Sequence, residues 1–127
     1  MAATRAPSAA PERSRSRTWA WTAGSGVALL VLVTIHMVAH HFVVQEVGGL
    51  RSYQQVLEYI ANPVIFVIEI AFLVVVTIHS MLGLRSVLFD FGLSERAKRR
   101  TDRALVALGV ATVAYGFVLI GVLASRA

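Results

Sequence analysis

Three long apolar stretches constrain what this chain of 127 residues can fold into. They run from about Trp19 to Val44, from Asn62 to Phe89 and from Arg103 to Ala124. Each has at least the roughly 20 residues that a helix needs to cross about 30 Å of hydrocarbon. Because unpaired backbone groups are costly in lipid, such stretches cross the membrane as helices. The sequence therefore predicts an all-α membrane protein with three transmembrane helices.

The composition agrees with a single domain whose helices face lipid. Hydrophobic residues make up 57% of the chain, and its mean hydropathy is +0.70. A water-soluble domain of this length needs far more polar surface. The chain has no cysteine, which excludes disulfides, iron–sulfur ligation and thiol catalysis within it. The net charge is +5, but the arginines lie beside the apolar stretches, so we expect them to contact anionic lipid and not nucleic acid.

Two segments lie outside the apolar stretches. Residues 1–18 are mainly Ala, Pro, Ser and Arg, which predicts a disordered basic tail before a three-helix membrane domain at 19–127. A cleaved signal peptide is the alternative, but the apolar run that follows is too long for one. Residues 45–61 are amphipathic and predict a short interfacial helix between the first two spans, after a break at Gly48-Gly49. Asn62 and Pro63 then suit the N-cap and first turn of the second span.

The basic residues predict an orientation. The N-terminal tail carries four arginines, whereas the first connection has only Arg51 and the C-terminus only Arg126. The second connection carries six basic residues: Arg85, Arg96, Lys98, Arg99, Arg100 and Arg103. The positive-inside rule then places the N-terminus and the second connection in the cytoplasm and the C-terminus outside.

A histidine near the end of the second stretch is the strongest candidate for a cofactor ligand. His79 begins the run His79-Ser80-Met81-Leu82-Gly83-Leu84-Arg85. An imidazole inside a membrane span is costly unless it has a function or a partner. Gly83, one turn later, leaves room for a bulky group, and Arg85 near the membrane edge suits an anionic one. Together they match the needs of haem b: a ligand, space for the ring and a cation for the propionates.

Each of His36, His40 and Glu69 has more than one interpretation. His36 suits either haem ligation or a helix–helix hydrogen bond, and His40 suits haem ligation, a helix cap or pairing with Glu69. Glu69 lies near the depth of His40 and suits such a pair, proton transfer, the border of a quinone site, or a neutral hydrogen-bonded role. His41 is expected to meet headgroups or water. At about 1.5 Å per residue, His36 and His79 lie at different depths, so we expect any second haem ligand to come from another chain.

A family resemblance rests on these residues. The run from His79 to Arg85, followed by Asp90-Phe91-Gly92, resembles the second-helix signature of the membrane-anchor subunits of succinate dehydrogenase and fumarate reductase. Gly24-Ser25-Gly26 and the three-helix layout are also similar to that family. The segment from His36 to Phe42 resembles the first-helix haem segment of its diheme members. The likeness covers about residues 19–124.

The resemblance implies a haem b-binding anchor of a succinate:quinone oxidoreductase in the cell inner (cytoplasmic) membrane. A flavoprotein subunit and an iron–sulfur subunit would pass electrons to membrane quinone, menaquinone or ubiquinone. A second anchor subunit would share one or two haems, and the complex could form a higher oligomer. His79 would ligate the haem nearer the cytoplasm and His36 an outer one, if present. The remaining candidates are haem contacts at Gly83, Arg85 and His40, and quinone contacts at Ser25, Asp90 and Glu69.

Two positions depart from the family pattern. Ala23 stands where many members carry an arginine, and Phe91 where some carry a quinone-bonding tyrosine. We therefore expect the partner anchor to supply part of the quinone pocket. Two other functions remain open: a different small membrane cytochrome b with another electron donor, and a non-haem scaffold or assembly protein.

Overall fold

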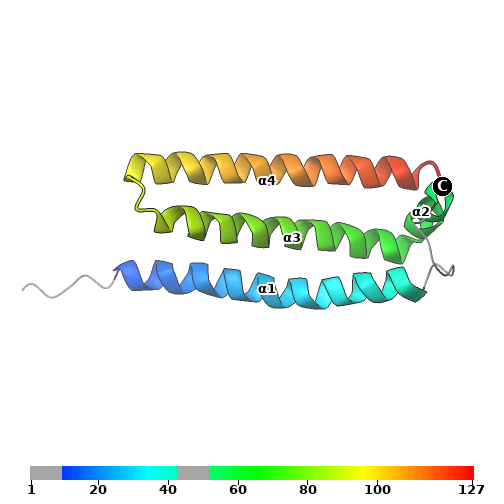
Figure 1. Ribbon diagram of the computed structural model, residues 1–127, viewed down its shortest axis with the longest axis horizontal. Helices are drawn as coiled ribbons and strands as arrows, with labels where there is room; N and C mark the ends of the chain where they lie inside the picture. Colours follow the sequence, from blue (N-terminus) through cyan, green and yellow to red (C-terminus); the bar gives the residue numbers. More distant parts are fainter. Residues whose placement is uncertain (1–9, 43–51) are drawn as a thin grey trace, which may run out of the picture.

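The computed structural model describes residues 10–42 and 52–127. This part contains α1 (Ala10–Phe42), α2 (Tyr53–Ala61), α3 (Pro63–Asp90) and α4 (Glu95–Ala124), and it contains no strand. The three long helices lie side by side in a row, with α3 in the middle and α2 at the end where the chain terminates (Figure 1). All three are long and apolar enough to cross a membrane. The predicted all-α fold with three spans is therefore confirmed.

The helix starts follow local capping chemistry. The side chain of Asn62 accepts hydrogen bonds from the backbone N–H groups of Val64 and Ile65, and Pro63 lies in the first turn of α3, as predicted. Ser52 and Gln55 form a capping box at the start of α2. Ser94 caps α4 by accepting from the N–H of Ala97. These polar caps divide the apolar sequence into separate helices.

Two long helices extend beyond the apolar stretches. α1 begins at Ala10, so residues 10–18 are helical, whereas the sequence analysis placed them in a disordered tail. α4 begins at Glu95, eight residues before the predicted span. Proline is tolerated in a first helical turn, as at Pro11, and charged residues such as Arg are good helix formers. Apolar content marks where a helix crosses lipid, and it does not mark where the helix ends. The proposed break at Gly48-Gly49 lies outside the described residues.

Packing is concentrated on the middle helix. α1 and α4 both pack against α3, α2 packs against α3 and α4, and α1 does not touch α4 within the described ranges. A Cβ at Gly116 of α4 would lie 2.6 Å from Leu73, so glycine allows a close approach to α3 at that point. Outward-facing apolar side chains such as Val27, Leu30 and Val118 are more than half exposed. Such a surface suits contact with lipid or with other membrane subunits.

The small buried core lies at the α2 end. Tyr59 and Ile60 of α2 are packed with Ile65 of α3, and Ile120 and Leu123 of α4 cover them. α2 is strongly amphipathic in sequence, so its buried face and its polar face are clearly separated. The short helix therefore closes one end of the row. The other end is held mainly by contacts between pairs of long helices.

Candidate functional site

His79 of α3 lies directly against α1. Its Nδ1 is 3.1 Å from the Ser25 hydroxyl oxygen. A Cβ added at Gly26 would lie only 3.2 Å from Cε1 of the same ring. In the Gly24-Ser25-Gly26 stretch, Gly26 therefore permits the close approach of the ring and Ser25 presents a hydroxyl to it. The contact joins the two segments that carried the family resemblance.

Hydrogen-bond direction determines which nitrogen of His79 is available. The Ser25 hydroxyl donates to the Thr22 carbonyl oxygen at 3.0 Å, so its oxygen serves as the acceptor for His79. Nδ1 then carries the ring proton, by assignment from this network. Nε2 carries the lone pair, and it has no hydrogen-bond partner among the described residues. Histidines that bind metals are typically held in this way, through the ring nitrogen that does not face the metal.

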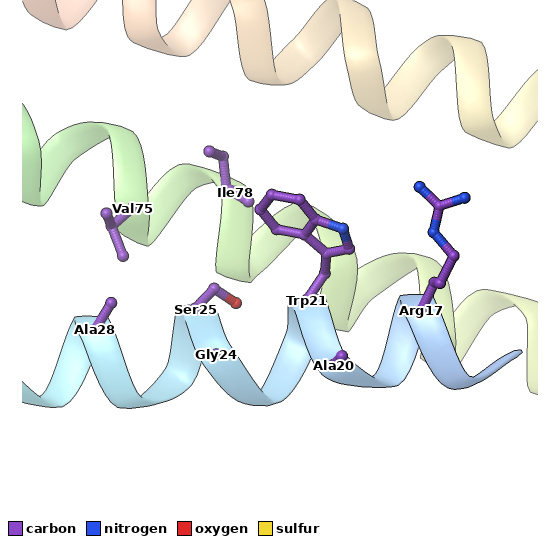
Figure 2. Close-up of a pocket in the computed structure, with 8 residues that line it drawn as sticks. All are labelled: Arg17, Ala20, Trp21, Gly24, Ser25, Ala28, Val75 and Ile78. Carbon is purple, nitrogen blue, oxygen red and sulfur yellow. The ribbon is translucent and has the colours of Figure 1, made fainter. Parts of the chain in front are cut away.

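A cavity of about 420 Å³ opens beside Ser25. Figure 2 shows Arg17, Trp21 and Ser25 projecting from the same side of α1, as their spacing of four residues requires. Val75 and Ile78 of α3 form the opposite wall. A guanidinium, an indole and a hydroxyl along one apolar wall suit a flat, mainly apolar ring that carries oxygen atoms.

Two of these side chains, Arg17 and Trp21, are not singled out by the sequence alone. Arg17 falls in the predicted basic tail, and Trp21 lies near the start of the first apolar stretch, where tryptophan is common at a membrane interface. The signal that identifies them is the repeat of four residues from Arg17 through Trp21 to Ser25, which puts all three on one helical face. That signal becomes informative only when the face of α1 that contacts α3 is known.

Arg85 forms an ion pair with Asp102, a contact that the sequence does not predict. Its Nε is 2.6 Å from Oδ1 of Asp102 on α4, and its guanidinium lies 4.1 Å from the centre of the Phe89 ring. The arginine therefore links α3 to α4. Gly83 has no atom within 4 Å of its would-be Cβ, so the surface of α3 is open there. Asp90 is exposed at the end of α3.

A second polar cluster occupies the other end of the α1–α3 contact. Glu69 Oε1 lies 2.8 Å from Nδ1 of His36 and 3.9 Å from Nε2 of His40. The hydroxyl of Tyr59 donates to the same oxygen at 2.7 Å. The His36 ring stacks on Phe72 with 5.0 Å between centroids. Glu69 thus lies at the depth of His40, as predicted, but its shorter contact is with His36.

The two histidine sites lie at different levels of the bundle. His79 faces Ser25 and His36 faces Glu69, and Ser25 and His36 are separated by about 16 Å along α1 at 1.5 Å per residue. This agrees with the depths estimated from the sequence. The chain therefore does not bring His36 and His79 to opposite faces of one haem. His41 is exposed and contacts Phe42 edge-on.

Comparison with known proteins gives a consistent result. Residues 7–118 match the family described as succinate dehydrogenase/fumarate reductase transmembrane subunit. The chain is also similar to the succinate dehydrogenase hydrophobic membrane anchor subunit of Thermoplasma acidophilum, with 28% identity over 96 residues. That alignment covers 75% of this chain and 76% of the relative. The family match over residues 7–118 includes His79, Ser25 and both ends of the α1–α3 contact.

Proposed function

Because this chain belongs to the family of succinate dehydrogenase/fumarate reductase transmembrane subunits, we propose that it is the haem b-binding membrane anchor of a succinate:quinone oxidoreductase. It is a multi-pass membrane protein, and membership of the family implies association with catalytic subunits. In this proposal the chain holds a cofactor and part of a quinone pocket. Succinate chemistry takes place on the partner subunits.

The proposal rests on the imidazole of His79, which is oriented by its hydrogen bond to Ser25. The Ser25 hydroxyl oxygen hydrogen-bonds Nδ1 of His79, which leaves the lone pair of Nε2 available as a metal ligand. Gly83, one turn away on the same face of α3, leaves the surface beside the ring open. These residues therefore fit a haem b, which His79 would ligate through Nε2. When bound, the haem accepts and returns one electron at a time between the iron–sulfur partner and quinone.

The cavity beside Ser25 is the proposed quinone site. Trp21 offers a flat face for the ring, and Arg17 offers charged donors for a carbonyl oxygen. The Ser25 hydroxyl already donates to Thr22, so it reaches a quinone only by giving up that bond. We therefore assign the donor role to Arg17 first and to Ser25 second. Glu69 lies at the far end of α3 and is not part of this pocket.

The remaining ligands and walls come from other subunits. This chain brings one histidine to the His79 site, so a further histidine ligand would come from the second anchor subunit. With the N-terminus in the cytoplasm, the cavity faces the side on which the iron–sulfur subunit docks. Asp90 and the basic segment from Arg96 to Arg103 lie at that end and provide a charged docking surface.

The test is isolation of the intact membrane complex through a tag on this chain. We expect co-purification of a flavoprotein and an iron–sulfur protein, together with a b-type haem spectrum. His79→Ala removes or strongly perturbs one haem signal, while the neighbouring control Ser80→Ala retains it. A haem-containing complex without a flavoprotein would instead identify another small cytochrome b. An unchanged spectrum in the His79 variant would exclude the ligand assignment.

A further inference from the structure

Three metal-binding side chains converge at the α2 end of the α1–α3 contact. His36 and His40 are four residues apart on α1 and share one face, and Glu69 approaches them from α3. One ligand atom from each residue lies within 4.8 Å of the others. The centroids of the two imidazole rings are 4.3 Å apart. Two histidines and a carboxylate are a common three-ligand set for zinc, with a fourth position open to water.

We propose that His36, His40 and Glu69 bind one first-row divalent metal ion of the Zn²⁺ class. The site lies about 16 Å along α1 from Ser25, and it does not depend on the proposed haem function. Imidazole nitrogen with one carboxylate oxygen favours Zn²⁺ over Mg²⁺ or Ca²⁺, which prefer oxygen ligands. The bound ion would cross-link α1 to α3.

The distances between the three ligand atoms need only a small adjustment to suit a tetrahedral metal site. With metal–ligand bonds of about 2.0–2.1 Å, ligand atoms of a tetrahedral site are about 3.3 Å apart. The contact of 2.8 Å between His36 and Glu69 must widen, and the 3.9 Å between His40 and Glu69 must shorten. Binding through Nδ1 of His36 also requires its proton on Nε2. A neutral imidazole meets this requirement by changing tautomer, without net proton release.

The residues around Glu69 orient its carboxylate and leave one of its oxygens available to a metal ion. Tyr59 and His36 both contact Oε1 of Glu69, whereas Oε2 receives no hydrogen bond from the described residues. Tyr59 is only 3% exposed, so its hydroxyl holds the carboxylate in a fixed orientation, as outer partners of metal ligands do. A cavity of about 120 Å³ lined by His40, Tyr59 and Glu69 reaches the site. It provides space for the ion and a water ligand.

A charge argument also favours a cation here. Glu69 lies inside a membrane-spanning helix, and its side chain is 13% exposed. A carboxylate in this setting is stable when it is neutralised or paired. His36 and Tyr59 contact the carboxylate within hydrogen-bonding distance, and the His40 ring packs on Tyr59. A divalent ion supplies both charge and coordination.

Zinc binding to the intact complex tests the proposal. The detergent-solubilised complex is stripped with EDTA, dialysed against ⁶⁵Zn²⁺ and compared with His36→Gln, His40→Gln and Glu69→Gln variants. Compared with the variants, we expect the wild type to bind one additional Zn²⁺ per copy of this chain. The affinity for this ion should fall at least tenfold in each variant. Zn²⁺ also raises the thermal midpoint of the wild type and leaves that of the variants unchanged.

Two controls separate this result from misfolding and from haem binding. The adjacent, exposed His41→Gln variant should bind Zn²⁺ like the wild type. Retention of the His79-dependent haem signal in the three ligand variants shows that the bundle has folded. Equal zinc binding in the wild type and the variants would overturn the proposal. A second haem that is lost in His36→Gln and kept in His79→Ala would also overturn it, and would assign His36 to that haem.

Discussion

The two ends of the α1–α3 contact each place a histidine at a helix interface, but the surroundings differ. At one end, His79 packs on Gly26 and forms a hydrogen bond with Ser25. At the other, His36 contacts Glu69 and stacks on Phe72, and Tyr59 binds the same carboxylate. The first end has small neighbours and an adjoining cavity. The second is filled with rings and covered by α2.

The difference shows that the neighbours of a membrane histidine determine its role. Small residues let the ring approach the opposite helix while the far nitrogen stays available, which suits a cofactor ligand. Aromatic and acidic neighbours engage the ring within the chain, which suits a helix cross-link or a compact ion site. The residue type alone does not distinguish the two.

The largest effect is expected from Gly26→Val. A side chain at this position forces the His79 ring away from α1, because the space above Gly26 is already filled. We expect loss of most of the haem signal in the purified complex, measured by the reduced-minus-oxidised spectrum. Gly24→Val, two residues earlier, meets no atom within 4 Å and should retain the haem. Equal haem content in the two variants would show that the close approach is unimportant.

Glu69→Leu should produce the next largest effect, on stability. It leaves the buried Tyr59 hydroxyl and His36 without their shared acceptor, at a cost of about 1–3 kcal/mol. Thermal unfolding of the complex measures this loss. Glu58→Leu, at an exposed position of α2, should change stability by less than about 0.5 kcal/mol. Similar midpoints for both variants would exclude a structural role for the Glu69 cluster.

Ser25→Ala should change the haem without removing it. Loss of the acceptor at Nδ1 lowers the basicity of His79 as a ligand and so favours the reduced iron. We expect the midpoint potential to rise by tens of mV, where about 59 mV corresponds to a factor of ten for one electron. Ser25→Thr keeps the hydroxyl and should stay close to the wild type in a redox titration. An unchanged potential in Ser25→Ala would show that the hydrogen bond does not tune the ligand.

The smallest effect concerns Arg85. Removal of its positive charge by Arg85→Leu disfavours the reduced haem and should lower the potential. Asp102 already neutralises much of that charge, so the shift should be smaller than the one from Ser25→Ala. Asp102→Leu should shift the potential in the opposite direction. Redox titration of both variants measures these shifts. Midpoint potentials that shift in the same direction would contradict an electrostatic effect of Arg85 that Asp102 offsets.

The features that the sequence predicted well are those encoded within a single segment. The three spans follow from hydropathy, and the start of α3 follows from Asn62 and Pro63. The depth match of Glu69 and His40 follows from counting residues along two helices. Each inference needs only the helical rise or local capping chemistry.

The features that the sequence could not supply depend on how each helix is rotated about its axis. The Arg85–Asp102 pair requires knowing which face of α4 meets α3. The wall formed by Arg17, Trp21 and Ser25 requires the same knowledge of α1. Lipid-facing and protein-facing surfaces are both apolar here, so hydrophobic periodicity carries little information about rotation.

The row of three helices also bears on how such a subunit acquires its ligands. In the described part of the chain, α1 does not touch α4, because α3 lies between them. Only at one end does α2 link them, where Tyr59 contacts His40 of α1 and α2 packs against α4, so away from α2 the layer is one helix thick. A wall of this kind encloses nothing by itself, and no helix has to swing aside to admit a large planar molecule. Loading is then lateral, across an open face, and it ends when a second wall closes over the molecule. In the proposed haem-binding role, the order in which the subunits assemble, and not motion within this fold, would set when the cofactor becomes trapped.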